Sequence, residues 1–175
     1  MVAAKEVIQV RELTRIFKVG SEDVRALKGI SFDIHEGEFV SIMGTSGSGK
    51  STLLNILGCL DKPTSGEYII NGIAVSSLSR NELSIIRNRQ IGFIFQNYNL
   101  LARTSALENV ELPLLYNNTI SAKERRERAL AALEAVQLTD RIHHTPSQLS
   151  ESQQQRVAIA RAFGNEPVIL LAGGG

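Results

Sequence analysis

The chain opens with an alternation of apolar and polar residues. Ile8 and Val10 fall on one face and Gln9 and Arg11 on the other, which is the period of a half-buried strand. The alternation breaks at Glu12. The pattern therefore predicts a first strand with one buried face and an interruption at Glu12.

Further strands are predicted where the chain is extended or uniformly apolar. A second extended stretch covers about residues 24–34, and a turn follows at 35–38. Short apolar runs at 39–43, 91–95 and 168–172 have the length of strands buried on both faces.

Helix starts are marked by Ser-x-x-Glu capping boxes at Ser79, Ser105 and Ser121. Pro113 is expected to kink the segment that Ser105 opens. After Ser121, apolar residues at 130, 133 and 136 recur at helical spacing and mark a buried face, whereas the mixed charges at 123–128 mark a solvated one. Alternating strands and helices predict an α/β fold in which helices from about 104 to 163 form an inserted subdomain.

Residues 44–51 read GTSGSGKS and fit the pattern G-x-x-x-x-G-K-[ST] at every fixed position. In such a loop the backbone N–H groups cradle phosphate oxygens, and the following helix, about 50–60, adds its positive dipole end. Lys50 is expected to reach the β- and γ-phosphates, and Ser51 to coordinate Mg²⁺. A flexible Gly/Ser loop is the alternative, and the flanking apolar strand and helix argue against it. The predicted nucleotide contacts here are Gly44, Thr45, Ser46, Gly47, Ser48, Gly49, Lys50, Ser51 and Thr52.

Composition narrows the class of protein. The 175 residues are 43% hydrophobic and 21% charged, an ordinary globular balance. A net charge of +1 argues against nucleic-acid binding. The single cysteine, Cys59, excludes a disulfide framework, and His35, His143 and His144 lack metal-ligand spacing. Without a membrane-length apolar run or a signal sequence, we expect a soluble, cytosolic chain that acts on membranes only through a partner.

Beyond the loop, the whole sequence resembles the ATP-binding cassette (ABC) ATPases. Residues 92–96, GFIFQ, resemble the Q-loop of that family, and residues 149–162, LSESQQQRVAIARA, resemble its signature region, which usually begins LSGGQ. Residues 168–172 resemble the strand that leads to the Walker B acid, and Phe17 stands at the aromatic A-loop position. The sequence around these motifs is most similar to that of cassettes of the macrolide-export and lipoprotein-release type.

The resemblance implies a P-loop NTPase (RecA-like) core with an N-terminal antiparallel β subdomain and an inserted α-helical subdomain. Residues 1–96 and 164–175 would form the ATP-binding core with its β subdomain. Residues 97–163 would form the helical subdomain with the signature region. The C-terminal part of the core would be missing.

The resemblance also implies residue roles, each beside a plainer interpretation. Phe17 would stack on adenine, or be a core or edge-strand aromatic. Gln96 would reach the Mg²⁺ and the attacking water, or be a polar strand-end residue. Ser150 and Gln153 would face the γ-phosphate of ATP held by a second copy, and they also form a capping box for a helix at 151–163.

Within the family, Lys50 and Gln96 would serve catalysis, and Ser51 and Gln96 would contact the metal. The cofactors would be ATP and Mg²⁺. Two cassettes would pair head to tail around ATP, and an integral membrane subunit would dock on the Q-loop and helical subdomain. The chain would then lie in the cytoplasm, peripheral on the inner face of the cell membrane.

Two departures from the family pattern affect these expectations. Glu151 and Ser152 replace the paired signature glycines. A carboxylate a few Å from a phosphate costs on the order of several kcal/mol at an effective dielectric constant of about 20, so we expect weaker closure of the ATP dimer.

Gly173 and Gly174 stand where the family has the Walker B Asp and the catalytic Glu, so we expect poor hydrolysis or none. The Gly-Gly-Gly end reads as a truncated or edited terminus that would leave strand 168–172 partly uncovered and the chain less stable.

Three functions remain after this comparison. The first is an energy-coupling ATPase subunit of a membrane transporter. The second is a catalytically inactive nucleotide-binding or scaffold module that docks a membrane partner. The third is another P-loop enzyme such as a small-molecule kinase, against which the stretch QQQRVAIARA argues.

Overall fold

The computed structural model describes residues 3–173. The chain divides into two compact units between Arg87 and Asn88. The division falls inside helix α2 (Arg80–Gln90).

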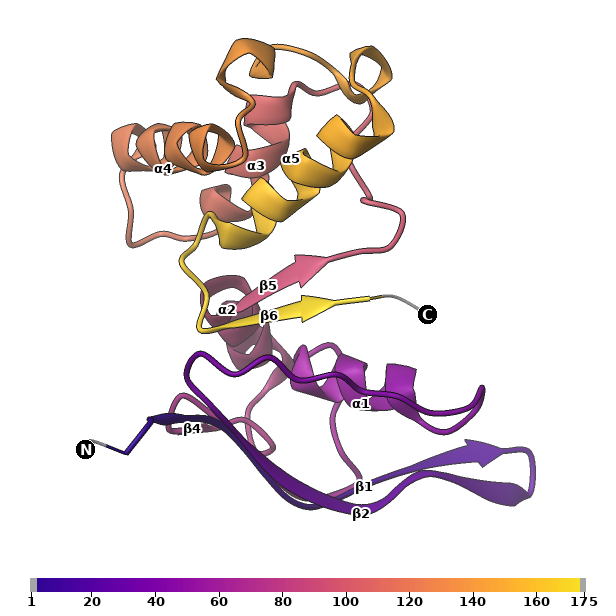
Figure 1. Cartoon of the computed structure of the whole chain (residues 1–175). Coiled ribbons are helices and arrows are strands. Elements are labelled where there is room, and N and C mark those ends of the chain that lie inside the picture. The colour runs from indigo at the N-terminus through magenta and orange to yellow at the C-terminus, as the bar shows by residue number, and fades with distance from the viewer. Residues whose placement is uncertain (1–2, 174–175) are drawn as a thin grey trace. The chain divides into compact units, whose positions relative to one another are not determined.

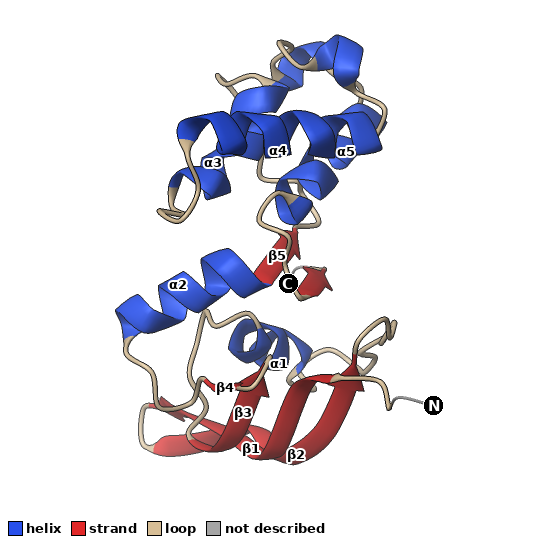
Figure 2. Cartoon of the chain, turned by 90° about the vertical axis from the view of Figure 1, so that its left-hand side faces the viewer, coloured by secondary structure: helices blue, strands red, loops and turns tan. Residues whose placement is uncertain are grey.

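The first unit is built on an antiparallel sheet of order β2-β1-β3-β4. Its strands are β1 (Glu6–Val19), β2 (Glu22–His35), β3 (Ser65–Ile70) and β4 (Ile73–Ala74), and helix α1 (Lys50–Leu57) covers one face of the sheet (Figure 2). Ile8 and Val10 are 2% and 0% exposed, which confirms the buried face predicted from the alternation. Apolar side chains from α1 and the sheet form the core of this unit, among them Val10, Leu13, Leu53, Ile56 and Leu57.

The break at Glu12 is a β-bulge. The register of β1 shifts between Val10 and Leu13, and Glu12 has a left-handed φ of 46°. Its N–H leaves the strand ladder and donates to Ser31 Oγ at 2.8 Å. A Cβ at Gly66 would lie 2.3 Å from the Glu12 carbonyl oxygen, so the neighbouring strand accommodates the bulge only with glycine.

The predicted turn at 35–38 is present, with Glu38 N–H donating to the His35 carbonyl at 3.2 Å. The strand predicted at 39–43 is wrong, because this segment has no strand structure. Phe39 and Met43 are 94% and 88% exposed. An apolar run becomes a strand only when another strand pairs with its backbone, and no strand among the described residues pairs with this one.

Helix α1 begins at Lys50, as predicted, but ends at Leu57 rather than near residue 60. Gly58 caps its C-terminus, and the buried Cys59 follows in the left-handed region with φ of 57°. Leu60 N–H then donates to the Asn55 carbonyl at 2.8 Å. The left-handed conformation of Cys59 ends α1, and Gly58 is the one signal in the sequence for this helix end.

The second unit is a helical cluster with a short parallel strand pair (Figure 1). Helices α3 (Ala106–Leu115), α4 (Ala122–Ala135) and α5 (Glu151–Phe163) surround one apolar core, with short 3₁₀ turns η1 (Thr139–Arg141) and η2 (Pro146–Gln148) between α4 and α5. Strand β5 (Ile91–Ile94) pairs in parallel with β6 (Ile169–Ala172). No helix within residues 3–173 has the length and apolar content needed to cross a membrane.

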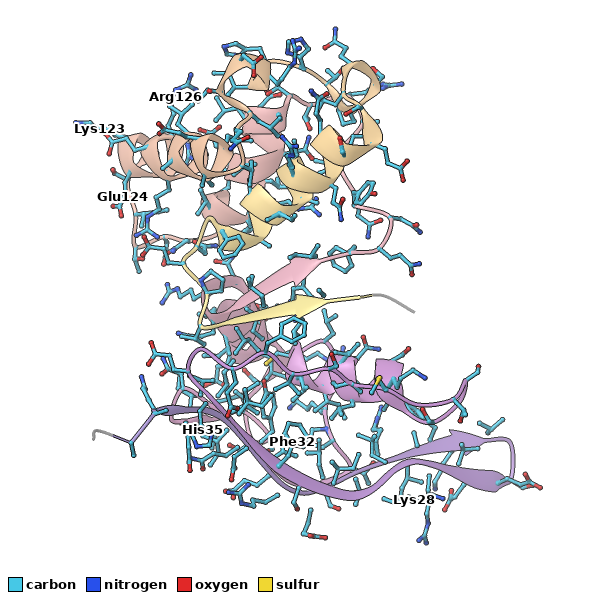
Figure 3. The ribbon with its side chains drawn as sticks, in the orientation of Figure 1. Lys28, Phe32, His35, Lys123, Glu124 and Arg126 are labelled. Atoms are coloured by element: carbon cyan, nitrogen blue, oxygen red, sulfur yellow. The ribbon has the colours of Figure 1, made fainter. Side chains whose placement is uncertain are left out.

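The capping boxes predicted at Ser79 and Ser105 are confirmed by both reciprocal hydrogen bonds. At Ser121 only the serine half is made, because the Glu124 carboxylate pairs with Arg128 at 2.7 Å instead. Leu133 of α4 is fully buried, whereas Lys123 and Arg126 project from the outer face of this helix (Figure 3).

Candidate functional site

The loop at 44–49 leads directly into helix α1. Gly49 is the N-cap residue, with φ of 94°, and no side chain caps the helix. The first turn of a helix presents N–H groups that have no partner within the helix, together with the positive end of its dipole. This end of α1 therefore offers donors suited to an anion.

Lys50 extends back over the loop that precedes it. Its Nζ donates to the carbonyl oxygens of Gly44 and Thr45 at 2.7 and 2.8 Å, and contacts Ser48 Oγ at 3.4 Å. These contacts hold a positive charge against the backbone of the loop, and its contact with the phosphates of a nucleotide stays a prediction. Ser51 lies exposed in the first turn of α1, next to this charge.

Two glycines of the loop are fixed by close approach. A Cβ at Gly49 would lie 2.5 Å from the Ala26 carbonyl oxygen on β2. A Cβ at Gly44 would lie 2.5 Å from Ser48 Oγ. The loop is thus seated against the β1–β2 hairpin at Gly49, where a side chain would displace it, whereas a side chain at Gly44 would meet Ser48 of the loop itself.

Phe17 lies on the same hairpin, half-buried, opposite Val24 in the β1–β2 register. The Arg15 guanidinium carbon lies 4.4 Å from the centroid of its ring. Ala26, which touches Gly49, is two residues from Val24 along β2. The hairpin register therefore sets Phe17 within a few residues of the loop contact.

Gln96, in the second unit, follows β5. The next turn contains two successive left-handed residues, Tyr98 and Asn99, with φ of 61° and 48°. Arg161 of α5 donates to both carbonyl oxygens, at 2.6 and 2.8 Å. Burial of this guanidinium lowers its pKa below the ordinary value. Arg161 thus fastens the turn after Gln96 to α5, a role that the sequence pattern did not reveal.

Ser150 caps α5 in the way predicted. Its Oγ accepts from Gln153 N–H at 3.2 Å, and Gln153 Oε1 accepts from Ser150 N–H at 2.9 Å. Glu151, which replaces a signature glycine, reaches the Tyr98 hydroxyl at 3.4 Å. The pKa of Tyr98 is raised, first by desolvation and then by the Glu151 charge. The structural half of the Ser150–Gln153 prediction is therefore confirmed, and its phosphate-binding half stays a prediction.

The predicted site residues fall into two groups. Phe17 and the loop residues 44–52 belong to the first unit, and Gln96, Ser150 and Gln153 to the second. Position 173, where the family has its Walker B acid, is an exposed glycine, and Gly174 lies outside the described residues. Within residues 3–173, no three Asp, Glu, His or Cys side chains cluster to hold a metal by themselves.

A glycine-rich loop that runs into an uncapped helix, with a lysine folded over it, defines a P-loop nucleotide-binding protein. Residues 27–172 match the family described as ABC transporter. The chain belongs to this family. Its fold, mixed α/β with an antiparallel β subdomain and a helical region, is that of the family's ATPase cassette, which confirms the predicted fold class.

Curated relatives and solved structures agree with this assignment. An uncharacterized ABC transporter ATP-binding protein of Thermotoga maritima is 56% identical over 168 residues, which are 96% of this chain and 71% of that protein. The macrolide export ATP-binding/permease protein MacB of Brucella melitensis is 53% identical over 97% of this chain and 26% of its own length. The dimeric post-hydrolysis structure of the ATP-binding cassette MJ0796, bound to ADP and Pi, is 53% identical, covers 94% of this chain and 72% of that chain, and superposes with a TM-score of 0.80.

Proposed function

We propose that this chain binds MgATP at residues 44–52 and acts as the energy-coupling subunit of an export transporter. The observation that carries the proposal is Lys50, whose ammonium lies over a glycine loop at the uncapped start of α1. A helix N-terminus and an adjacent ammonium together favour the terminal phosphates of a nucleotide. The dimeric cassette and the permease-fused relative support the transporter role.

In this proposal Mg²⁺ binds the site together with the phosphates of the nucleotide. Mg²⁺ prefers oxygen ligands and usually combines one or two protein groups with phosphate oxygens and waters. Ser51 supplies a hydroxyl at the start of α1, and the described residues hold no carboxylate cluster that would bind the cation alone. A bound cation would supply neutralisation of phosphate charge; in this proposal Lys50 would orient the β- and γ-phosphates, and Gln96 would hold the attacking water.

The proposed assembly extends beyond one chain. Ser150 and Gln153 would act on ATP held by a second copy, since the start of α5 is also a helix N-terminus. In this proposal residues 1–96 with 164–175 would serve as the ATP-binding core, and residues 97–163 would serve as the helical subdomain that docks the membrane subunit. Such a chain would work in the cytoplasm, at the inner face of the membrane.

Nucleotide binding is tested by the melting temperature with and without MgATP. Ligand at a hundredfold excess over its Kd stabilises a protein by about 2.7 kcal/mol, so the original chain is expected to show a clear upward shift. Lys50→Ala should abolish the shift, and Lys28→Ala, which removes an exposed lysine on the outside of β2 (Figure 3), should preserve it. An undiminished shift in Lys50→Ala would refute the site.

The inactive nucleotide-binding module is favoured by one specific observation. Position 173 carries no carboxylate that could hold the cation or activate water. Phosphate release from MgATP separates the two functions: release that disappears in Lys50→Ala identifies an ATPase, and binding without release identifies the module.

A further inference from the structure

An ion pair stands directly behind the aromatic ring of the proposed adenine site. Arg15 Nε and Nη2 donate to the two carboxylate oxygens of Asp61 at 2.9 and 3.1 Å. The guanidinium carbon also lies 4.4 Å from the Phe17 ring centroid. Arg15 is therefore held by a carboxylate fork while it covers one face of the ring.

The chain brings these three residues together from distant parts of its sequence. Arg15 and Phe17 lie two residues apart on β1, whereas Asp61 follows the end of α1, 46 residues after Arg15. The segment after Asp61 is fixed along β1, because Thr64 N–H donates to the Thr14 carbonyl at 2.8 Å and Thr64 Oγ1 accepts from Ile16 N–H at 2.9 Å. These bonds hold the chain three residues after Asp61 against β1, and the Lys62 N–H, which donates to Asp61 Oδ1 at 2.8 Å, helps to orient the carboxylate.

The Arg15–Asp61 pair is more shielded from solvent than an ordinary surface ion pair. The side chains of Arg15 and Asp61 are 25% and 33% exposed. Bidentate Arg–carboxylate pairs in such partly shielded positions have a fixed plane as well as a charge. A guanidinium held in one place over an aromatic face attracts that face through the ring quadrupole and so favours one placement of the ring.

We infer that Arg15, held by Asp61, is a positioning residue for the purine end of the nucleotide. It covers one face of Phe17 and fixes the ring, so a planar base stacks on the opposite face. Ordering of the ring before binding removes part of the entropy cost of stacking. This inference rests on the proposed binding of nucleotide at residues 44–52.

The test compares two ligands that differ in the base. Calorimetry with MgATP and with magnesium tripolyphosphate measures the Kd values of the original chain and of Arg15→Gln and Asp61→Asn. Both variants are expected to weaken MgATP binding about two- to fivefold, the range that corresponds to an exposed cation–π contact. Tripolyphosphate binding should stay unchanged, because it uses only the loop and the start of α1. Asp61→Glu, which keeps the charge pair, should retain most of the ATP affinity.

A double-variant cycle shows whether Arg15 acts through the ring. Phe17→Ala should itself weaken MgATP at least fivefold, as expected for loss of base stacking. Adding Arg15→Gln to Phe17→Ala should then cost nothing further. The matched control is Arg11→Gln, which breaks the exposed Arg11–Asp33 pair between β1 and β2, at 2.6 Å, and should leave the binding of both ligands unaffected.

The outcomes separate this inference from the proposed function. Equal losses for MgATP and tripolyphosphate, or unchanged ATP affinity in both Arg15→Gln and Asp61→Asn, overturn the positioning role and leave the nucleotide site intact. Failure of the original chain to bind either ligand overturns the proposed function and this inference with it. Since Asp61→Asn alters neither the ring nor Arg15 in size, it keeps the test decisive where Arg15→Gln folds poorly.

Discussion

Gly49 meets two separate geometrical demands at one position. Its backbone is left-handed, and its α-carbon lies against the Ala26 carbonyl of the neighbouring hairpin. Only the absence of a side chain satisfies both demands.

We expect Gly49→Ala to destabilise the chain more than Gly20→Ala. A left-handed alanine costs about 1–2 kcal/mol at either position. At Gly49 its Cβ would also meet backbone at 2.5 Å, whereas at Gly20 nothing lies within 4 Å. Urea denaturation of the two variants measures the difference, and equal midpoints would show that the loop yields without cost.

The buried thiol of Cys59 makes stability depend on alkaline pH. Desolvation raises the pKa of this thiol from its ordinary value of 9.0 to about 11. Between those values the unfolded chain releases the proton before the folded chain does, so stability falls as pH rises through this window and is unaffected below it. The urea midpoint should therefore drop more from pH 8 to pH 10.5 in the original chain than in Cys59→Ala. Identical drops would contradict this linkage.

The first turn of α5 and its N-cap allow two serines, one that caps the helix and one that does not, to be compared for their effect on stability. Ser150 Oγ accepts the N-cap hydrogen bond from Gln153 N–H, whereas Ser152 contributes only a hydroxyl contact at 3.2 Å to Ser150. Ser150→Ala should lower the free energy of unfolding by about 1 kcal/mol. Ser152→Ala should change it by less than about 0.5 kcal/mol. Thermal denaturation followed by circular dichroism checks this, and a neutral Ser150→Ala would mean that water replaces the cap.

The same helix shows how far the sequence alone could lead. Its predicted range, 151–163, matches α5 because a capping box and a helical period are local signals. The strand expected at 39–43 failed because strand pairing depends on residues far away in the chain. The Arg15–Asp61 pair was equally invisible, since nothing near either residue points to a partner 46 positions away. The loop at 44–51 was predictable because glycines, lysine and helix start are consecutive.

At the scale of the whole molecule, the two groups of site residues lie in different units. The proposed mechanism uses a second copy, whose Ser150 and Gln153 would complete the site. Glu151 then matters beyond its own helix, because its charge would face the nucleotide of the partner unless it stays near the Tyr98 hydroxyl.

We expect glycine at both departing signature positions to promote ATP-dependent pairing. In a background that carries Gly173→Asp and Gly174→Glu, the double change Glu151→Gly and Ser152→Gly removes a carboxylate and a Cβ from the approach of the second nucleotide. Sedimentation velocity with MgATP should show a larger dimer fraction. Glu127→Ala, which removes an exposed charge on α4, is the control and should leave pairing unchanged. Equal dimer fractions in the glycine variant and its parent would remove the electrostatic argument.

The bulge in β1 has a consequence for how the sheet can vary. A Cβ at Gly66 would meet the Glu12 carbonyl at 2.3 Å, and one at Gly29 would meet Glu12 Oε2 at 2.9 Å. The bulge at Glu12 thus constrains three strands at once, and we expect positions 12, 29 and 66 to vary together. A mutational library should recover larger residues at position 66 only among members whose first strand has also lost its extra residue.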